Sequence, residues 1–374
     1  MPDISYTLAI DGRPAPAELM ARLDGIEMEQ HVDMADILRL SFSVGLGDDG
    51  EWSIADEGIF ARLTPLRLEA SVGSESTETL VEAYVTETSL TLDNEPGRST
   101  FEVIAMDPTV LMNLEEKVRS WPDMTDADIA ASIFSEYGFD TEVEPTSPAR
   151  QETQQTVIQR GTDIRFLLRL AARNGYECAV KPDPVTGRSI GHFHPPRLQG
   201  DPQGVLSVAM GEATNVNGLG IRFNMTRPQV TEAAGMDIET QSEQSGSAEE
   251  TQRPLLGESG ASATQRPRRE LLAGTGLAES GELQTQAQAV TDSSAFAVTA
   301  EGDLNTAAYG GVLRAGATVN LRGAGTRYSG TYYVESVLHV LHGSSYEQHF
   351  SLRRNAYGLS GQEDFTESSA LPSL

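Results

Sequence analysis

The sequence predicts an α+β protein that is mainly β, with its helices confined to the middle of the chain. Three observations support this fold class. Apolar and polar residues alternate up to about residue 106, apolar residues recur with a helical period in the segment 107–199, and alternation returns in the segment 200–358. A chain of 374 residues is long enough for two or three domains. We therefore expect a β-rich first part, a mixed α/β middle part and a β-rich last part.

Strands in the first part, residues 1–106, are indicated by runs in which every second residue is apolar. Such alternation places the apolar side chains on one face of a sheet. The runs are Tyr6 to Ile10, Leu66 to Val72, Val81 to Val85 and Phe101 to Ala105. We expect a β-rich first domain.

A short helix is expected directly after this part, because Asp107 followed by Pro108 is typical of a helix start. Its apolar stripe would consist of Val110, Leu111, Leu114 and Val118.

A second helix is indicated by Thr125 and Asp128, whose spacing resembles a capping box. Gly138 would end this helix. Its buried face would consist of Ile129, Ile133, Phe134 and Tyr137.

A third helix should begin at Thr162 or Asp163 and end at Gly175. Its apolar face would be lined by Ile164, Phe166, Leu167, Leu168, Leu170 and Ala171. We expect this face to belong to the core of the middle part, so that Leu168→Ala would cost about 2–5 kcal/mol of stability.

The middle part should close with a hairpin, because the runs Tyr176 to Val180 and Ser189 to His194 flank a turn-forming segment. In the last part the expected strands are Leu206 to Met210, Gly220 to Met225, Ala317 to Leu321, Thr331 to Leu341 and Glu347 to Arg354. The insertion 231–270 is polar and acidic, and we expect it to be mobile unless a partner holds it. The tail 359–374 is expected to be loose.

Acidic residues dominate the charge of the chain, since 55 Asp and Glu outnumber 27 Lys and Arg and give a formal net charge of −28. Phosphate backbones would be repelled, which excludes nucleic acid as the main partner. No apolar stretch approaches the ~20 residues of a membrane-spanning helix, and residues 1–11 lack the features of a secretion signal. We expect no membrane span and folding in the cytoplasm. The single cysteine, Cys178, excludes a disulfide framework and a zinc site of several cysteines.

A nucleophilic serine is suggested only by spacing, because Ser189 lies between Gly187 and Gly191 as in a nucleophile elbow. That motif requires a helix directly after the serine, whereas His-Phe-His-Pro-Pro follows here. We therefore expect no catalytic serine. The carboxylates are too many and too scattered to single out an acid–base pair, and no glycine-rich segment has the spacing and context of a nucleotide-binding loop.

His192 and His194 would point to the same side of a strand and could together bind a metal ion. The sequence places no third or fourth ligand near them, so we favour exposed hairpin histidines over a metal site. The expectation is therefore no catalytic residue, no cofactor and no metal ligand. Ser189, His192 and His194 should be dispensable for assembly.

The stretch Ile158 to Val180 resembles the signature of the phage late control protein D family and of the hub part of VgrG proteins. In these families a Gln and a short acidic turn precede a Phe-Leu-x-Arg-Leu helix that ends in Gly and an aromatic strand. The chain has the same order, IQRGTDIRFLLRLAARNGYECAV. Further resemblance lies in Phe101 to Trp121, Ile129 to Gly138, Leu313 to Gly316 and Gly330 to Val334. The first hundred residues match only in their pattern of strands.

This resemblance implies a structural baseplate hub of a contractile tail or contractile injection system. It implies two tube-like β-barrel domains, at 1–106 and 200–358, on either side of the mixed domain at 107–199. Three chains would form a homotrimer that adapts a sixfold inner tube to a threefold spike. The implied partners are the inner tube protein, a spike protein and other baseplate subunits in an assembled particle. Because no repetitive β-spike follows the second barrel, we expect the spike to be a separate chain.

Two other functions stay open on the residues alone. One is a tail-associated enzyme that degrades cell walls, which would need a convergent acid–base or metal site. The other is a β-barrel module that binds a ligand and would be expected to work as a monomer. We expect a hub without enzymatic activity.

Overall fold

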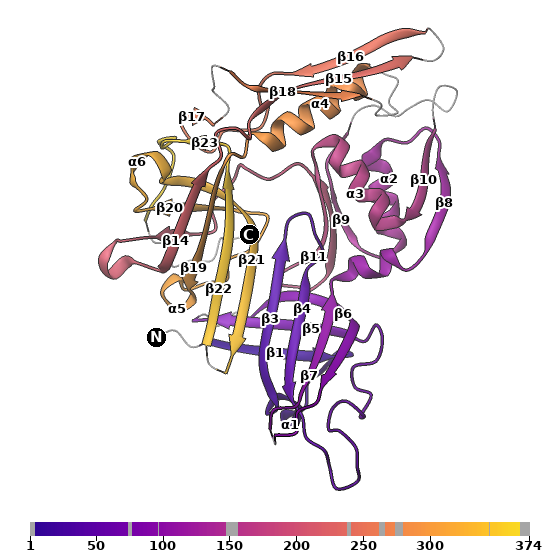
Figure 1. Cartoon of the computed structure of the whole chain (residues 1–374), viewed down its shortest axis with the longest axis vertical. Helices are drawn as coiled ribbons and strands as arrows, with labels where there is room; N and C mark the ends of the chain where they lie inside the picture. The colour runs from indigo at the N-terminus through magenta and orange to yellow at the C-terminus, as the bar shows by residue number, and fades with distance from the viewer. Residues whose placement is uncertain are drawn as a thin grey trace.

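One large sheet carries most of the fold in the computed structural model (Figure 1). The structure describes residues 4–73, 77–95, 97–146, 156–237, 241–261, 266–273, 280–343 and 345–366. Along the sheet the strands follow the order β14-β19-β22-β21-β3-β4-β7-β6-β5-β1-β2, with β20 paired to β21 and β13 paired to β20. Their bounds are β1 Ile4–Ile10, β2 Arg13–Pro14, β3 Leu23–His31, β4 Ile37–Ser43, β5 Pro65–Val72, β6 Glu78–Thr91, β7 Thr100–Met106, β13 Val205–Ser207, β14 Val216–Phe223, β19 Val298–Asn305, β20 Thr318–Arg322, β21 Gly330–His342 and β22 Ser345–Arg354. The expected mainly β class is confirmed.

The first and last parts of the chain meet inside this sheet. Strand β21 pairs antiparallel with β3, with partners from Ser336 opposite His31 to Leu341 opposite Ile26. Among the described strands no pairing closes either β-rich part into a barrel, so the barrel arrangement stays a prediction. The two parts instead share one continuous ladder of backbone hydrogen bonds.

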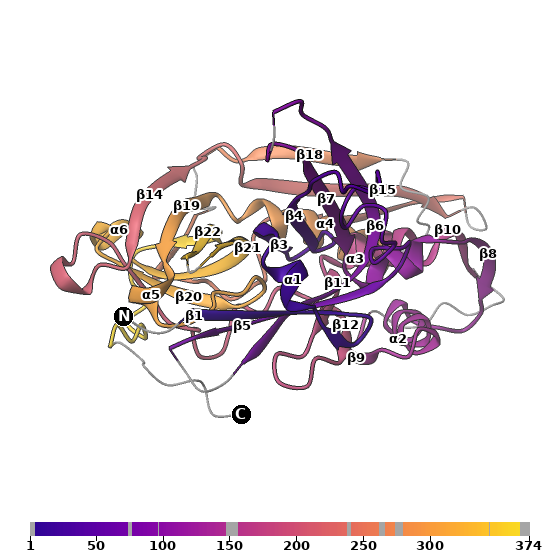
Figure 2. The same ribbon diagram turned by 90° about the horizontal axis from the view of Figure 1, so that it is seen from below.

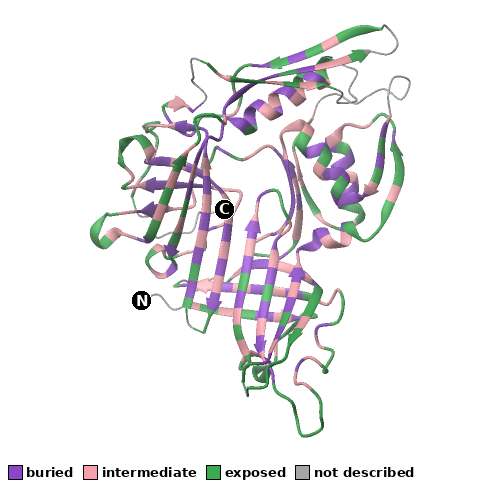
Figure 3. Cartoon of the chain, viewed as in Figure 1, coloured by how far each residue is buried: buried purple, intermediate pink, exposed green. Residues whose placement is uncertain are grey.

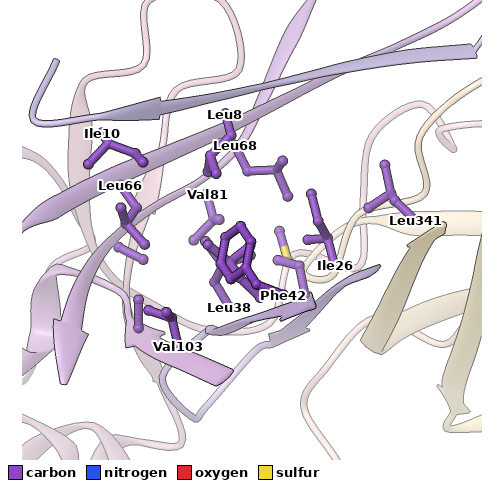
Figure 4. Close-up of a cluster of buried hydrophobic side chains, with 14 of the residues drawn as sticks. Leu8, Ile10, Ile26, Leu38, Phe42, Leu66, Leu68, Val81, Val103 and Leu341 are labelled. Atoms are coloured by element: carbon purple, nitrogen blue, oxygen red, sulfur yellow. The ribbon is translucent and has the colours of Figure 1, made fainter. Parts of the chain in front are cut away.

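The first part folds over on itself because β6 is long and irregular. Its first half, up to Tyr84, pairs with β5, and its second half, from Tyr84 onward, pairs with β7, with a register shift between Val85 and Glu87. Irregularities of this kind bend a strand and allow it to turn a corner. As a result β1 and β5 run across β3, β4 and β7 (Figure 1), and the core lies between the two layers (Figure 4). Leu341 of β21 contributes to this core beside Ile26.

Alternating side chains account for these strands, as the alternating burial colours show (Figure 3). The four runs predicted in the first part all correspond to strands. Strands β3 and β4 were missed, although Leu38, Leu40 and Phe42 alternate in β4 and are buried. The five strands predicted in the last part are present with shifted ends, and β19 was missed.

The first predicted helix of the middle part is only a short 3₁₀ helix, η1 (Pro108–Asn113). Asp107 caps it as predicted, and its side chain accepts a hydrogen bond from the backbone N–H of Thr109. The predicted apolar stripe is wrong, because Leu114 and Val118 are exposed and Val118 lies on strand β8 (Glu116–Trp121). Strand β8 pairs along its length with β10 (Val157–Thr162), and this ladder replaces the helix.

The second and third predicted helices are present. Helix α2 (Asp126–Glu136) begins with the predicted Thr125–Asp128 capping box. Helix α3 (Asp163–Asn174) ends at Gly175, which adopts the left-handed conformation that favours glycine. The side chain of Leu167 is fully buried, whereas Leu168 is only half-buried at the edge of the same cluster. We therefore expect the large loss of stability for Leu167→Ala and a smaller loss for Leu168→Ala.

The predicted hairpin forms part of a second, three-stranded sheet. Strands β11 (Glu177–Pro182) and β12 (Ser189–His194) pair antiparallel, and β9 (Asp140–Val143) adds to β12 in parallel. A Cβ atom at Gly191 of β12 would lie 2.4 Å from the Phe134 ring of α2. The glycine thus allows α2 to pack closely on this sheet.

The polar insertion 231–270 contains strands where the structure describes it, and its mobility without a partner stays a prediction. Its strands belong to a small sheet, β15 (Gln229–Asp237), β16 (Ser242–Ala248) and β18 (Arg268–Ala273), covered by helix α4 (Ser280–Ser294). Gln284 of α4 donates to the Ser247 carbonyl over 2.7 Å and accepts from its N–H over 2.9 Å. These two hydrogen bonds connect β16 to α4. Residues 238–240 and 262–265 of the insertion lie outside the described residues.

The remaining elements are short. They are α1 (Ala17–Met20), η2 (Gly211–Ala213), β17 (Ser259–Gly260), α5 (Thr306–Tyr309), α6 (Gly325–Tyr328) and β23 (Ala356–Tyr357). The turned view places β14 and α6 on one side of the molecule and β8 with α2 on the opposite side (Figure 2). No helix among the described residues is both long and apolar enough to cross a bilayer.

The start of the predicted loose tail is held against β20. Asn320 donates to the Asp364 carbonyl and Arg322 to the Phe365 carbonyl, each over 2.8 Å. Whether the tail 359–374 as a whole is loose stays a prediction, and residues 367–374 lie outside the described residues.

Folding stability should depend on pH through His339, which is fully buried on β21. Burial, helped by the charge of Arg314, lowers the pKa of His339 to about 3. An unfolded histidine takes up its proton near pH 6.5, so acid should favour unfolding by up to about 1.4 kcal/mol per pH unit below that pH. His339→Gln should remove the contribution of this histidine and so change the pH slope of the free energy of unfolding by up to about 1.4 kcal/mol per pH unit between about pH 4 and 6.

Tyr346→Phe is the matched control for this prediction. The Tyr346 hydroxyl lies 2.8 Å from His339 Nδ1, so the control removes the hydrogen bond and keeps the titrating ring. It should retain the pH slope of the parent chain. A slope that is the same in His339→Gln and in the parent would contradict the prediction.

Candidate functional site

The candidate functional feature is the joint, the region where the middle sheet meets both β-rich parts. We define the joint by Asp36, Glu177, Lys181, Tyr333 and Arg353. Glu177 and Lys181 lie four residues apart on β11 and so point to the same face of that strand. This face connects the middle part to β3, β21 and β22.

Lys181 connects the middle part to the first part. Its ammonium donates to the His31 carbonyl over 2.8 Å and forms an ion pair with Asp36. Asp36 is fully buried, and its backbone N–H donates to Asp107 Oδ2 over 2.8 Å. Asp107 is therefore both the cap of η1 and a member of this buried network.

Burial dominates the titration of these two carboxyl groups. It raises the pKa of Asp36 although Lys181 opposes the rise. Burial and the nearby Asp36 raise the pKa of Asp107 to about 6. The folded chain therefore favours the protonated form of Asp107. The stability that this form contributes is fully present below the ordinary pKa of Asp and is lost as the pH rises through about 6.

Arg353 connects the last part to the middle part. Its guanidinium donates to Glu177 Oε1 over 2.6 Å, and the Tyr333 hydroxyl donates to Glu177 Oε2 over 2.5 Å. The guanidinium also lies over the rings of Phe296 and Tyr333, at 4.8 and 5.1 Å from their centres. Burial raises the pKa of Glu177, and the charge of Arg353 opposes the rise.

A further ion pair joins the first and last parts directly. Arg314 Nη2 donates to Glu78 Oε2 over 2.8 Å and to the Thr79 carbonyl over 3.0 Å. Partly buried pairs of this geometry orient the elements that carry them. The arrangement can hold three parts of the chain in one fixed relation.

Ser189 does not have the surroundings of a nucleophile. It begins β12, and its hydroxyl donates to Glu82 Oε2 over 3.2 Å. A strand follows the serine, so the helix that a nucleophile elbow requires is not at this position.

His192 and His194 are not exposed hairpin residues, so that interpretation is wrong. The side chain of His192 is 19% exposed, and the whole residue His194 is 6% exposed. The structure places Glu142 of β9 beside them, and one ligand atom from each of the three residues lies within 4.8 Å of the others. Burial lowers the pKa of His192 to about 4.

Sequence reasoning missed Asp36, Glu142 and Arg353. The alternation of side chains along a strand could have shown only that Glu177 and Lys181 share one face, with Ala179 between them. Their partners are up to 176 positions away along the chain, and pairing between such distant strands has no local signal in the sequence.

The fold is shared with phage tail proteins. The 43 kDa tail protein of prophage MuSo2 from Shewanella oneidensis has 14% identity and a TM-score of 0.66, with 94% of this chain and 98% of that chain covered. A tail protein from Neisseria meningitidis MC58 has 10% identity and a TM-score of 0.65, with 94% and 97% covered.

A third solved structure, the E. coli c3393 protein, is described as a component of the type VI secretion system that resembles T4 bacteriophage tail proteins gp27 and gp5. It has 13% identity and a TM-score of 0.55, with 96% of this chain and 79% of that chain covered. The expected similarity to tail proteins is thus confirmed for the fold, while the resemblance to late control protein D itself stays a prediction.

No match to the sequence was found among curated proteins. A family model does match, from residue 3 to residue 343, and its description is the Alg8 N-terminal domain. Because this match spans most of the 374 residues, the chain belongs to the Alg8 N-terminal domain family.

Proposed function

We propose that the chain is a structural subunit, the baseplate hub, of a contractile tail or contractile injection system, and that it is not an enzyme. The observation that supports this most strongly is the fold shared with the MuSo2 tail protein over nearly the full length of both chains. In this role the subunit transmits force between its neighbours and performs no reaction.

The contacts of the joint suit a subunit that transmits force between its neighbours. Load applied to the last part passes through the β21–β3 ladder into the first part, and through Arg353–Glu177 into the middle part. We propose that 1–106, 107–199 and 200–358 act as three domains locked together in this way.

We propose further that three copies form a ring that adapts a sixfold inner tube to a threefold spike, with other baseplate subunits around it. The large sheet ends in β14 on one side and in β2 on the other, and strand edges offer backbone groups to a neighbouring chain. Exposed Val118 and Ile158 on the β8–β10 pair add apolar area for contacts.

The oligomer should be a trimer that becomes tighter as salt rises from low to moderate concentration. Each copy carries a formal charge of −28, so association is opposed by repulsion that salt screens. Apolar burial, which obligate interfaces use over ~2,000 Å² or more, is not weakened by that screening. Mass measurement across a salt and concentration series should show a species of three 40.2 kDa chains.

Two outcomes would count against this proposal. A chain that stays monomeric at every salt concentration and protein concentration would contradict self-assembly. A trimer that dissociates as salt rises would show that ion pairs, rather than apolar contacts, hold the ring. Electron microscopy of the trimer should show a threefold ring.

A further inference from the structure

Glu142, His192 and His194 have the spacing of metal ligands. His194 Nε2 lies 3.3 Å from His192 Nδ1, and His192 Nδ1 lies 3.3 Å from Glu142 Oε2. In a tetrahedral zinc site with bonds of about 2.0–2.1 Å, neighbouring ligand atoms are about 3.3–3.4 Å apart. Two of the three separations in this cluster are therefore already those of a zinc site.

The register of the middle sheet holds these three side chains together. Glu142 lies directly opposite His192 in the parallel β9–β12 pair, and His194 follows two residues later on the same side of β12. Because all three lie on paired strands, the backbone keeps the donor atoms in place. Sites on regular elements are more precisely positioned than sites on loops.

Hydrogen bonds around the cluster orient two of the three proposed metal ligands, His194 and Glu142. His194 Nδ1 lies 2.8 Å from the Pro195 carbonyl, so this nitrogen carries the hydrogen and the lone pair of Nε2 is left toward His192. Arg197 donates to Glu142 Oε2 over 2.5 Å. A carboxylate has about four lone-pair sites, so it can accept this bond and still bind a cation. Metal ligands commonly have such outer hydrogen bonds.

Exposure leaves one side of the cluster open. The side chain of Glu142 is 40% exposed, whereas that of His192 is 19% exposed. Water can therefore reach the cluster from the Glu142 side and complete a set of four ligands.

We propose that Glu142, His192 and His194 bind a divalent transition-metal ion of the zinc class, with water as the fourth ligand. Two imidazoles with one carboxylate favour zinc and its neighbours over magnesium and calcium, which prefer oxygen ligands. The ion would connect β9 to β12 and so stiffen the sheet that carries the joint. This proposal does not depend on the hub function.

The test uses the untagged full-length chain after treatment with a chelator. Calorimetric titration with ZnCl₂ should give one Zn²⁺ per chain, and zinc should raise the thermal midpoint because only the folded chain holds the site. MgCl₂ should give neither effect. Co²⁺ in the same site should show the strong visible absorption of a tetrahedral ion, which reports the ligand geometry independently of any variant.

His192→Asn and Glu142→Gln should each weaken zinc binding at least about tenfold, since even outer-shell changes cost 10–100-fold. The matched control is His349→Asn, because His349 Nδ1 contacts Asp303 at 2.6 Å and so forms an exposed pair of one histidine and one carboxylate. The control should bind zinc like the parent chain. Absence of stoichiometric zinc, or equal affinity in the parent and both ligand variants, would overturn the proposal.

Discussion

Replacing Arg354 by methionine should lower the free energy of unfolding by about 3 kcal/mol or more. Arg354 ends β22 and is fully buried. Its guanidinium donates to the carbonyls of Leu256, Ser329 and Gly358 over 2.6–3.0 Å. Methionine fills much of the same volume but donates no hydrogen bond, so three carbonyls would lose a partner, at about 1–3 kcal/mol for each one left unsatisfied. Methionine carries no charge, so the cost of removing the guanidinium from water disappears, which offsets part of this loss.

Arg222→Met is the matched control, because Arg222 is exposed on β14. Guanidinium-induced unfolding of both variants and of the parent chain should show a change within about 0.5 kcal/mol for the control. If Arg354→Met cost less than about 1 kcal/mol, water would have to replace the guanidinium at these carbonyls, and Arg354 would not hold the segments around β22 together.

Leu167→Ala should destabilise the chain by about 2–5 kcal/mol. Leu167 on α3 is fully buried in the cluster that also contains Met112, Ile133 and Phe193. Truncation removes buried methyl groups and leaves a cavity that neighbours on two helices and a sheet can only partly fill.

Leu168→Ala is a matched control that differs by one position on the same helix. Its side chain is half-buried at the edge of the cluster, so the loss should be about 1 kcal/mol or less. Thermal and denaturant unfolding of the two variants should rank them in this order. Equal losses would show that the face of α3 is rotated from the one described.

Helix ends and strand faces could be predicted because their causes are local. The Thr125–Asp128 box and the left-handed Gly175 act within one turn of a helix, so neighbouring residues suffice to predict them. The segment after η1 shows the limit of such reasoning. Val118 has helical spacing from Leu114, yet pairing with β10 decides that it lies on a strand.

The polar insertion shows a second limit of local reasoning. Its composition predicts disorder only when the segment is considered alone. Helix α4 supplies side chains such as Gln284 and Thr291 that satisfy its backbone and hydroxyl groups. Nothing within 231–270 indicates that a helix more than thirty residues from β16 would cover it.

The sequence by itself determined the mainly β class, the helices α2 and α3, the hairpin β11–β12 and the shared side of His192 and His194. Each of these depends on residues a few positions apart, whose geometry is set by the backbone period. Tertiary structure alone decided that β21 pairs with β3, that Lys181 meets Asp36, and that Glu142 lies opposite His192. These contacts join distant segments, and they form only when the buried faces of the sheets pack together, because no local interaction specifies them.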